Sequence, residues 1–120
     1  MTATIVEVDI WLRGTQHATT RPMRGIVPQP ELWTDEDVRT LLVEMLRTLE
    51  REKNPNGFPP DIALRGFNWI VSPCDHGVVV HLELAMGTAS AGPFAIDGDR
   101  LSAMVTRVMA APEPVAPRVH

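Results

Sequence analysis

Two groups of residues in this chain have side chains that could do chemistry. The first is the triplet Cys74-Asp75-His76, in which a thiol lies two residues from an imidazole. A nearby base or positive charge helps a thiol to form the thiolate, which is both a nucleophile and a metal ligand. However, the surrounding Pro, Asp and Gly are typical of a hairpin turn, and the spacing to His81 matches no recognised zinc motif. A turn is therefore favoured over a catalytic or metal site.

The second group consists of acids and a histidine on two alternating segments. Glu7 and Asp9 fall on one side of the first segment, and His81 and Glu83 fall on one side of a later segment. Carboxylates beside an imidazole can shift one another's pKa values towards a range useful for proton transfer, and they can bind a divalent metal. These residues leave open a small-ligand or metal-dependent enzyme, or a receptor, with the loop 14–33 as its roof.

Alternation of apolar and polar residues predicts the strands that would position these groups. The turn 73–77 would join two of the strands as a hairpin. The small residues of 87–93 predict a loop, and 94–96 could add one short edge strand. Residues 14–33 hold either a short strand near 23–27, which would complete an N-terminal hairpin, or a working loop. The main predicted strands are 4–13, 62–72 and 77–86.

Helical periodicity predicts two helices. The first covers residues 34–53 and has Thr34 as its N-cap. The second follows Asp97 or Asp99, either of which could cap it. Each helix carries one apolar stripe with the spacing i, i+3, i+4, i+7, which is typical of a helix packed on a core. The stripes consist of Val38, Leu41, Leu42, Met45, Leu46 and Leu49, and of Leu101, Met104, Val105, Val108 and Met109.

The order of the elements is strand, helix, strand, strand, an optional strand and helix. Because each helix has one apolar stripe and each strand one apolar face, two packed layers are the simplest arrangement. We therefore predict an α+β two-layer sandwich, with a three- to four-stranded, mainly antiparallel sheet and two helices on one face. Residues 1–111 would form the single domain, and the proline-rich segment 112–120 would be a flexible tail.

Composition narrows the class of partner. The chain has 120 residues, of which 44% are hydrophobic and 22% charged, as in an ordinary globular domain. A net charge of −4 disfavours nucleic acid as a partner, because phosphate binding needs a basic face. The arginine-containing arm 13–24 is the one feature that supports such binding.

The same composition gives an expected location. No apolar run reaches the roughly 20 residues of a membrane-spanning helix, and the N-terminus has no pattern of a signal peptide. The one cysteine, Cys74, allows no internal disulfide, which is consistent with a reducing cytoplasm. Ten of the eleven basic residues are arginine, which suggests GC-rich codons and hence a bacterial source.

Two helices can cover only one side of a sheet, so the other side is expected to expose aromatic and charged side chains. Exposed apolar patches mark interaction surfaces, and Trp and Arg are favoured interface anchors. We therefore expect a small non-enzymatic binding protein, a homodimer or a partner-docking module, with no cofactor. The sequence does not determine which side of the strand 62–72 points outward, because a shift of one residue in register reverses the side of every side chain. The expected binding residues are Trp11, Arg13, Arg65, Phe67, Trp69, His81 and Glu83.

Overall fold

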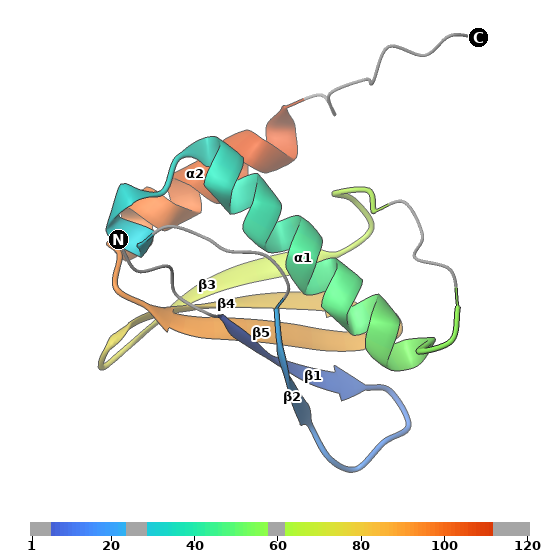
Figure 1. The fold of residues 1–120 in the computed structure, drawn as a ribbon. Helices are drawn as coiled ribbons and strands as arrows, with labels where there is room; N and C mark the ends of the chain where they lie inside the picture. The colour runs from blue at the N-terminus through green and yellow to red at the C-terminus, as the bar shows by residue number, and fades with distance from the viewer. Residues whose placement is uncertain (1–5, 24–28, 58–61, 112–120) are drawn as a thin grey trace, which may run out of the picture.

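The computed structural model describes residues 6–23, 29–57 and 62–111, which form a sheet layer and a helix layer (Figure 1). The predicted tail 112–120 lies outside the described residues. Among the described residues, no helix has the length and apolar character needed to cross a membrane. The elements are β1 (Glu7–Leu12), β2 (Thr19–Pro22), the 3-10 helix η1 (Pro30–Leu32), α1 (Asp35–Lys53), β3 (Asn68–Cys74), β4 (Gly77–Leu84), β5 (Gly87–Phe94) and α2 (Gly98–Ala110).

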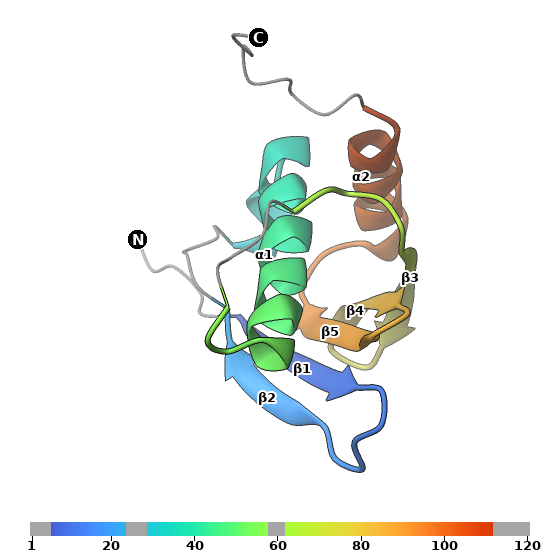
Figure 2. The same cartoon turned by 90° about the vertical axis from the view of Figure 1, so that its right-hand side faces the viewer.

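The sheet is antiparallel and has the strand order β2-β1-β5-β4-β3. The strands β3, β4 and β5 form a meander, and β5 then pairs with β1, so that β5 lies at the centre. Both helices lie on the same side of this sheet (Figure 2). The predicted α+β sandwich is therefore confirmed, with five strands in place of three to four.

The strands β2 and β5, which the three main predicted strands do not include, have weak sequence signals. An N-terminal hairpin is present, but its second strand is Thr19–Pro22 and not a segment near 23–27. The described part of that segment, Met23, is buried, and 24–28 lie outside the described residues.

The prediction of a loop at 87–93 with an edge strand at 94–96 is wrong, because Gly87–Phe94 is the central strand. Glycine, alanine and serine are weak strand formers, and packing between β1 and β4 overrides that preference. Small residues also fit this position, since a Cβ atom at Gly87 would clash with the backbone carbonyl of Trp11.

The other strands agree with their alternation and differ at their ends. The strands β1 and β4 bury the predicted apolar side, including Val8, Ile10, Val80 and Leu82. The strand β3 begins and ends later than the predicted 62–72.

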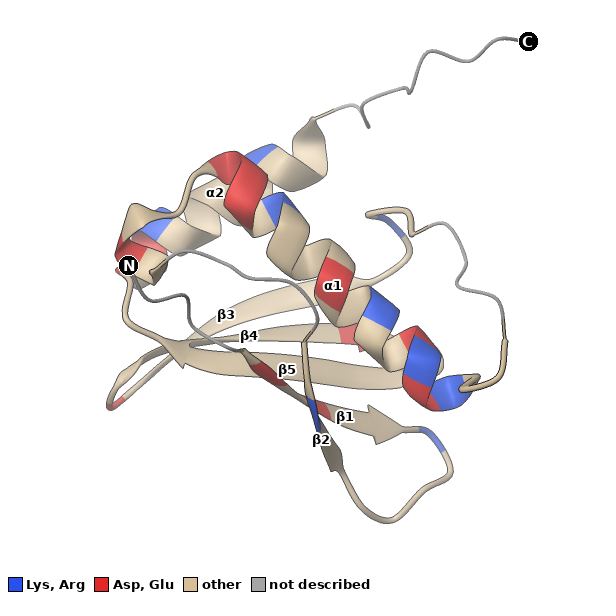
Figure 3. Cartoon of the chain, in the orientation of Figure 1, with Lys and Arg blue, Asp and Glu red and all other residues tan. Residues whose placement is uncertain are grey.

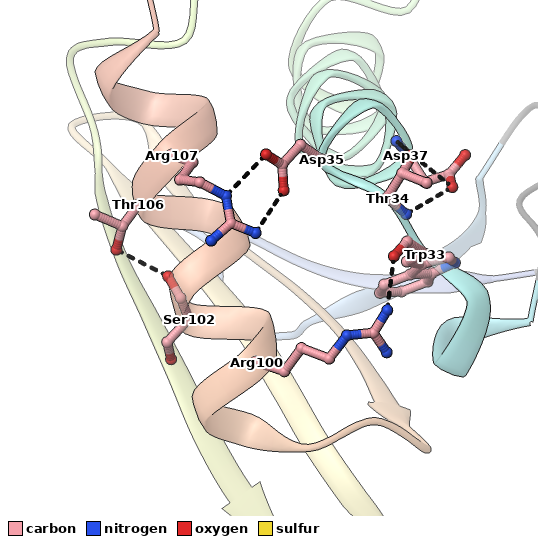
Figure 4. Close-up of polar contacts among 8 residues, drawn as sticks. All are labelled: Trp33, Thr34, Asp35, Asp37, Arg100, Ser102, Thr106 and Arg107. Carbon is pink, nitrogen blue, oxygen red and sulfur yellow. Dashed lines mark hydrogen bonds and ion pairs between the residues drawn. The ribbon is translucent and has the colours of Figure 1, made fainter.

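Both predicted helix caps are confirmed. The backbone N–H of Asp37 donates to the Thr34 hydroxyl at 3.3 Å, and the Thr34 N–H donates to the Asp37 carboxylate at 2.9 Å (Figure 4). This reciprocal pair is a capping box, which satisfies donors that the first turn leaves free. At α2, the Asp97 carboxylate accepts from the backbone N–H of Arg100 at 3.0 Å.

The core lies between the helices and the sheet. The helix stripes are buried as predicted, with Met109 half-buried at the edge. Trp33, which precedes α1, is 1% exposed and packs edge-on against Phe94 with ring centroids 4.8 Å apart. This core fixes β1, β5 and β4 on their helix side, so the geometry of their opposite side is set by the same packing.

Arginines of α2 join the two helices at their exposed side. Arg107 makes a two-point contact with the carboxylate of Asp35, with both N···O distances 2.9 Å (Figure 4). This contact lowers the pKa of Asp35. Arg100 donates to the carbonyl oxygens of Glu31 at 2.8 Å and Trp33 at 3.0 Å. The start of α1 is therefore tied to α2 by polar contacts as well as by the core.

Candidate functional site

The side of the sheet away from the helices, called the open face below, carries the polar residues that the sequence singles out. Its members follow from the strand register, because directly paired residues point to the same side of a sheet. Asp9 pairs with Ser90, and Ser90 pairs with His81. The open face consists of Glu7, Asp9, Trp11, Thr20, Pro22, Asn68, Ile70, Ser72, Val79, His81, Glu83, Thr88 and Ser90.

One row of the open face crosses all five strands. The Thr20 hydroxyl donates to the Asp9 carboxylate at 2.6 Å, and His81 Nδ1 lies 2.6 Å from the Ser90 hydroxyl. Both contacts run between neighbouring strands and so hold these polar side chains in place. The row reads Thr20, Asp9, Ser90, His81 and Ile70.

A second row contains an exposed aromatic ring and an acid. Trp11 of β1 and Glu83 of β4 lie on either side of Thr88, which pairs with both. The indole N–H of Trp11 donates to the carbonyl of Thr15 at 3.1 Å, which fixes the ring towards the β1–β2 turn. Trp11 remains 36% exposed. The row therefore presents a positioned, accessible ring and a carboxylate separated by one small side chain.

Arg13, another expected binding residue, lies just beyond the end of β1. Its Nε donates to the carbonyl of Ala85 at 2.8 Å, and its backbone N–H donates to the carbonyl of Met86 at 2.8 Å. Arg13 therefore connects the chain after β1 to the β4–β5 turn and sits at the margin of the open face.

The expectation that Phe67 and Trp69 share a face with Trp11 is wrong. Trp69 pairs with the fully buried Leu82, which places its ring on the helix side, where it packs half-buried against the core. Phe67 precedes β3 and also packs against the core. Arg65 is exposed but lies before β3, away from the paired strands. Of the aromatic residues expected on this surface, the structure places Trp11 there.

The loop 14–33 does not roof the open face over the part of it that the structure describes. Residues 13–18 form the connection from β1 to β2, and β2 extends the sheet sideways. Met23 and Trp33 are buried on the helix side. The hydrogen bond and charge of Glu52 raise the pKa of Arg21, and this contact ties β2 to α1 rather than to any ligand.

The triplet Cys74-Asp75-His76 lies at the tip of the β3–β4 hairpin, as its turn residues predict. All three residues are exposed. Over the described ranges, no group of three His, Cys, Asp or Glu residues is arranged to hold a metal ion. The triplet therefore has a structural explanation as a turn.

Charge divides the open face from the helix layer. The sheet strands contribute Glu7, Asp9 and Glu83 to the open face, with Arg13 at its margin. Acidic and basic positions alternate along α1, whereas the marked positions on β1 are acidic (Figure 3). Across the described residues, the open face thus has an excess of carboxylates.

The open-face residues that were missed from the sequence include Thr20, Thr88, Ser90, Asn68 and Ile70. The first three lie on β2 and β5, which were not predicted as strands. The alternation of Thr88 and Ser90 with the buried Ala89 and Ala91 is the signal that could have identified them. Asn68 and Ile70, of which Ile70 is 59% exposed, were missed because the sequence did not determine the outward face of their strand.

Comparisons with known proteins give no indication of function. No protein-family model, curated protein or solved structure matches the chain. The functional argument therefore rests on the residues of the open face themselves.

Proposed function

We propose that the protein is a small binding protein, not an enzyme, which docks a positively charged segment of another protein on its open face. The observation that carries this proposal is that an exposed Trp11 and several carboxylates share the side of the sheet that neither α1 nor α2 covers. Aromatic rings and carboxylates are the two groups that bind a guanidinium best, by stacking and by charge-assisted hydrogen bonds.

Charge favours a basic partner over a second copy on this face. A two-fold axis through the open face would bring Asp9, Glu7 and Glu83 near the same carboxylates of the other copy. Like charges placed together oppose association, whereas a cationic segment is attracted to them. The face is therefore suited to a partner of opposite charge.

The second row of the face supplies a place for an arginine side chain. Adjacent strands lie about 4.8 Å apart, so the backbones under Trp11 and Glu83 are separated by roughly 10 Å. An arginine lying over Thr88 would have the indole on one side and the Glu83 carboxylate on the other. The hydroxyls of Thr88 and Ser90 add hydrogen-bonding groups along the same strand.

The test is calorimetric titration of the full chain with a short blocked peptide in which arginine and threonine alternate. Binding should weaken as salt rises, because exposed charge pairs are screened. Trp11→Ala and Glu83→Gln should each reduce the affinity by about two- to fivefold, since an exposed cation–π contact or charge pair contributes roughly 0.5–1 kcal/mol.

Two controls make this experiment decisive. Glu36→Gln removes an exposed carboxylate from α1 and should leave peptide affinity unchanged. The same peptide with glutamate in place of arginine should not bind. If the arginine peptide fails to bind, or if Glu36→Gln weakens it as much as Glu83→Gln, the open face is not a docking surface for cations.

A second candidate function is a small-ligand site at Glu7, Asp9, His81 and Glu83. The 2.6 Å contact between His81 Nδ1 and Ser90 Oγ favours it, because this pair could share hydrogen bonds with a small polar ligand. Thermal unfolding of wild type and His81→Ala with inorganic phosphate and with zinc is the test. A rise in Tm with wild type that His81→Ala abolishes supports this candidate, since a ligand of the native state stabilises it. Equal curves with and without either ion count against it.

A further inference from the structure

The outer side of β3 is the longer of the two sheet edges. The strand β3 has seven residues, whereas the opposite edge strand β2 has four. Among the described residues, β4 is the one strand that pairs with β3 (Figure 2). An exposed strand edge offers a row of free N–H and C=O groups to another chain.

Pro73 determines which backbone groups point outward. In an antiparallel ladder, hydrogen-bonded pairs alternate with pairs that make no hydrogen bond to the partner strand. Pro73 pairs with Val78 and has no N–H, so it fits a non-hydrogen-bonded position. Val71 and Trp69 have the same phase along an uninterrupted register. Their N–H and C=O groups therefore point away from β4, towards the edge.

The side chains of β3 add an apolar strip to this edge. Ile70, between those two residues, is 59% exposed on the open face. Trp69 and Val71 are half-buried on the helix side. An edge with apolar side chains on both faces can bury them against an identical edge.

We infer that the protein forms a two-fold dimer by antiparallel pairing of β3 with β3 of a second copy, centred on Ile70. In this register Trp69 of one copy exchanges both backbone hydrogen bonds with Val71 of the other, and the reverse pair does the same. Ile70 then meets Ile70 of the second copy in a non-hydrogen-bonded pair, where side chains approach most closely. Trp69 and Val71 become cross-strand neighbours of aromatic and β-branched type, which is a favourable combination.

Charge complementarity favours this antiparallel pairing. Arg65 precedes the first residue of β3 and Asp75 follows its last residue, so pairing centred on Ile70 brings Arg65 of one copy towards Asp75 of the other at both ends of the interface. Both side chains are exposed, and neither is in an ion pair among the described residues. Exposed ion pairs contribute little affinity, so this pair would favour the antiparallel orientation rather than hold the dimer.

The test is sedimentation equilibrium of the full chain over a concentration series. Wild type should approach twice the monomer mass of 13.3 kDa. Ile70→Lys places two ammonium groups together at the axis and should weaken the dimer by about tenfold or more. The matched control is Leu32→Lys, because Leu32 is a similarly exposed apolar residue, at 58%, in η1 away from β3. Leu32→Lys should leave the dimer intact.

A charge-swap series tests the contact between Arg65 and Asp75. Arg65→Asp and Asp75→Arg should each weaken the dimer by about two- to fivefold, and the double variant should restore it. A wild type that stays at 13.3 kDa, or a dimer that Ile70→Lys leaves unchanged, would overturn the inference. Single swaps without effect would overturn the proposed contact between Arg65 and Asp75. None of these outcomes depends on peptide binding by the open face, which is tested at Trp11 and Glu83.

Discussion

Neighbouring residues of one strand point to opposite sides of the sheet, and the two sides differ in how far their side chains are exposed. On the helix side, Ile10 and Leu82 are 1% and 0% exposed, respectively. On the open face, the adjacent Trp11 is 36% exposed and Ile70 is 59% exposed. Stability therefore comes mainly from one side, while the other side can be changed with little cost to the fold. This difference separates two roles that alternate residue by residue along β1 and β4.

The largest expected effect comes from comparing adjacent residues of β4 on opposite sides. Leu82→Ala should lower the free energy of unfolding by about 2–5 kcal/mol, because it leaves a cavity in a packed core. Glu83→Ala should change it by less than about 0.5 kcal/mol, as expected of an exposed residue. Urea denaturation measures both values. Similar losses for the two variants would break the distinction between the sides.

The next largest effect tests β5, the strand at the centre of the sheet. Gly87→Ala should destabilise by more than about 1 kcal/mol, because its positive φ of 154° and the carbonyl of Trp11 both oppose a side chain. Gly14→Ala is the control, since Gly14 has a positive φ of 93° but nothing within 4 Å of an added Cβ. Urea denaturation should show the greater loss for Gly87→Ala. An equal loss would mean that the close approach of β5 to β1 does not matter.

A smaller effect concerns the helix layer that makes the two sides unequal. Thr34→Ala removes the capping box of α1 and should cost about 1 kcal/mol. Its expected signature is a lower Tm with unchanged binding of the arginine–threonine peptide, because the open face is not touched. Differential scanning calorimetry and calorimetric titration measure these two quantities. A loss of peptide affinity would show that the helix layer shapes the open face more closely than we propose.

The smallest effect concerns pH. The Arg107 guanidinium lowers the pKa of Asp35 in the folded protein. A carboxyl with a lowered folded pKa adds stability above its ordinary pKa, and this stability is lost as pH falls through the folded value. Asp35→Asn should therefore lower Tm slightly at neutral pH, and the difference from wild type should shrink in acid. The effect is small because the pair is exposed. A Tm difference that grows in acid would contradict the role assigned to the Asp35–Arg107 pair.

The sequence predicts the helix layer better than the sheet. The stripe of α1 and the caps Thr34 and Asp97 are local signals, since periodicity and capping depend on residues within a turn or two. The strand β4 is equally clear, because its large β-branched residues alternate with polar ones. Such elements could be predicted because each local preference agrees with the fold.

The missing parts of the sheet depend on contacts between distant segments. The strand β5 reads as a loop because Thr88, Ser90 and their small neighbours have little preference for a strand, and pairing with β1 and β4 determines its conformation. In β3, both sides carry apolar residues, so alternation shows which residues share a side but not which side faces the helices. Pairing of Trp69 with Leu82 decides that direction. The candidate site was therefore half predicted: Trp11, His81 and Glu83 were correctly placed together, whereas Phe67 and Trp69 were not.

The most direct test of the open face as the docking surface uses the three tryptophans as internal reporters. Their indole N–H signals can be followed by NMR while the full chain is titrated with the arginine–threonine peptide. We predict that the Trp11 signal moves with the amides of Thr88 and Glu83, while the signals of the buried Trp33 and the helix-side Trp69 stay in place. A titration that moves Trp33 or Trp69 and leaves Trp11 unchanged would contradict the account.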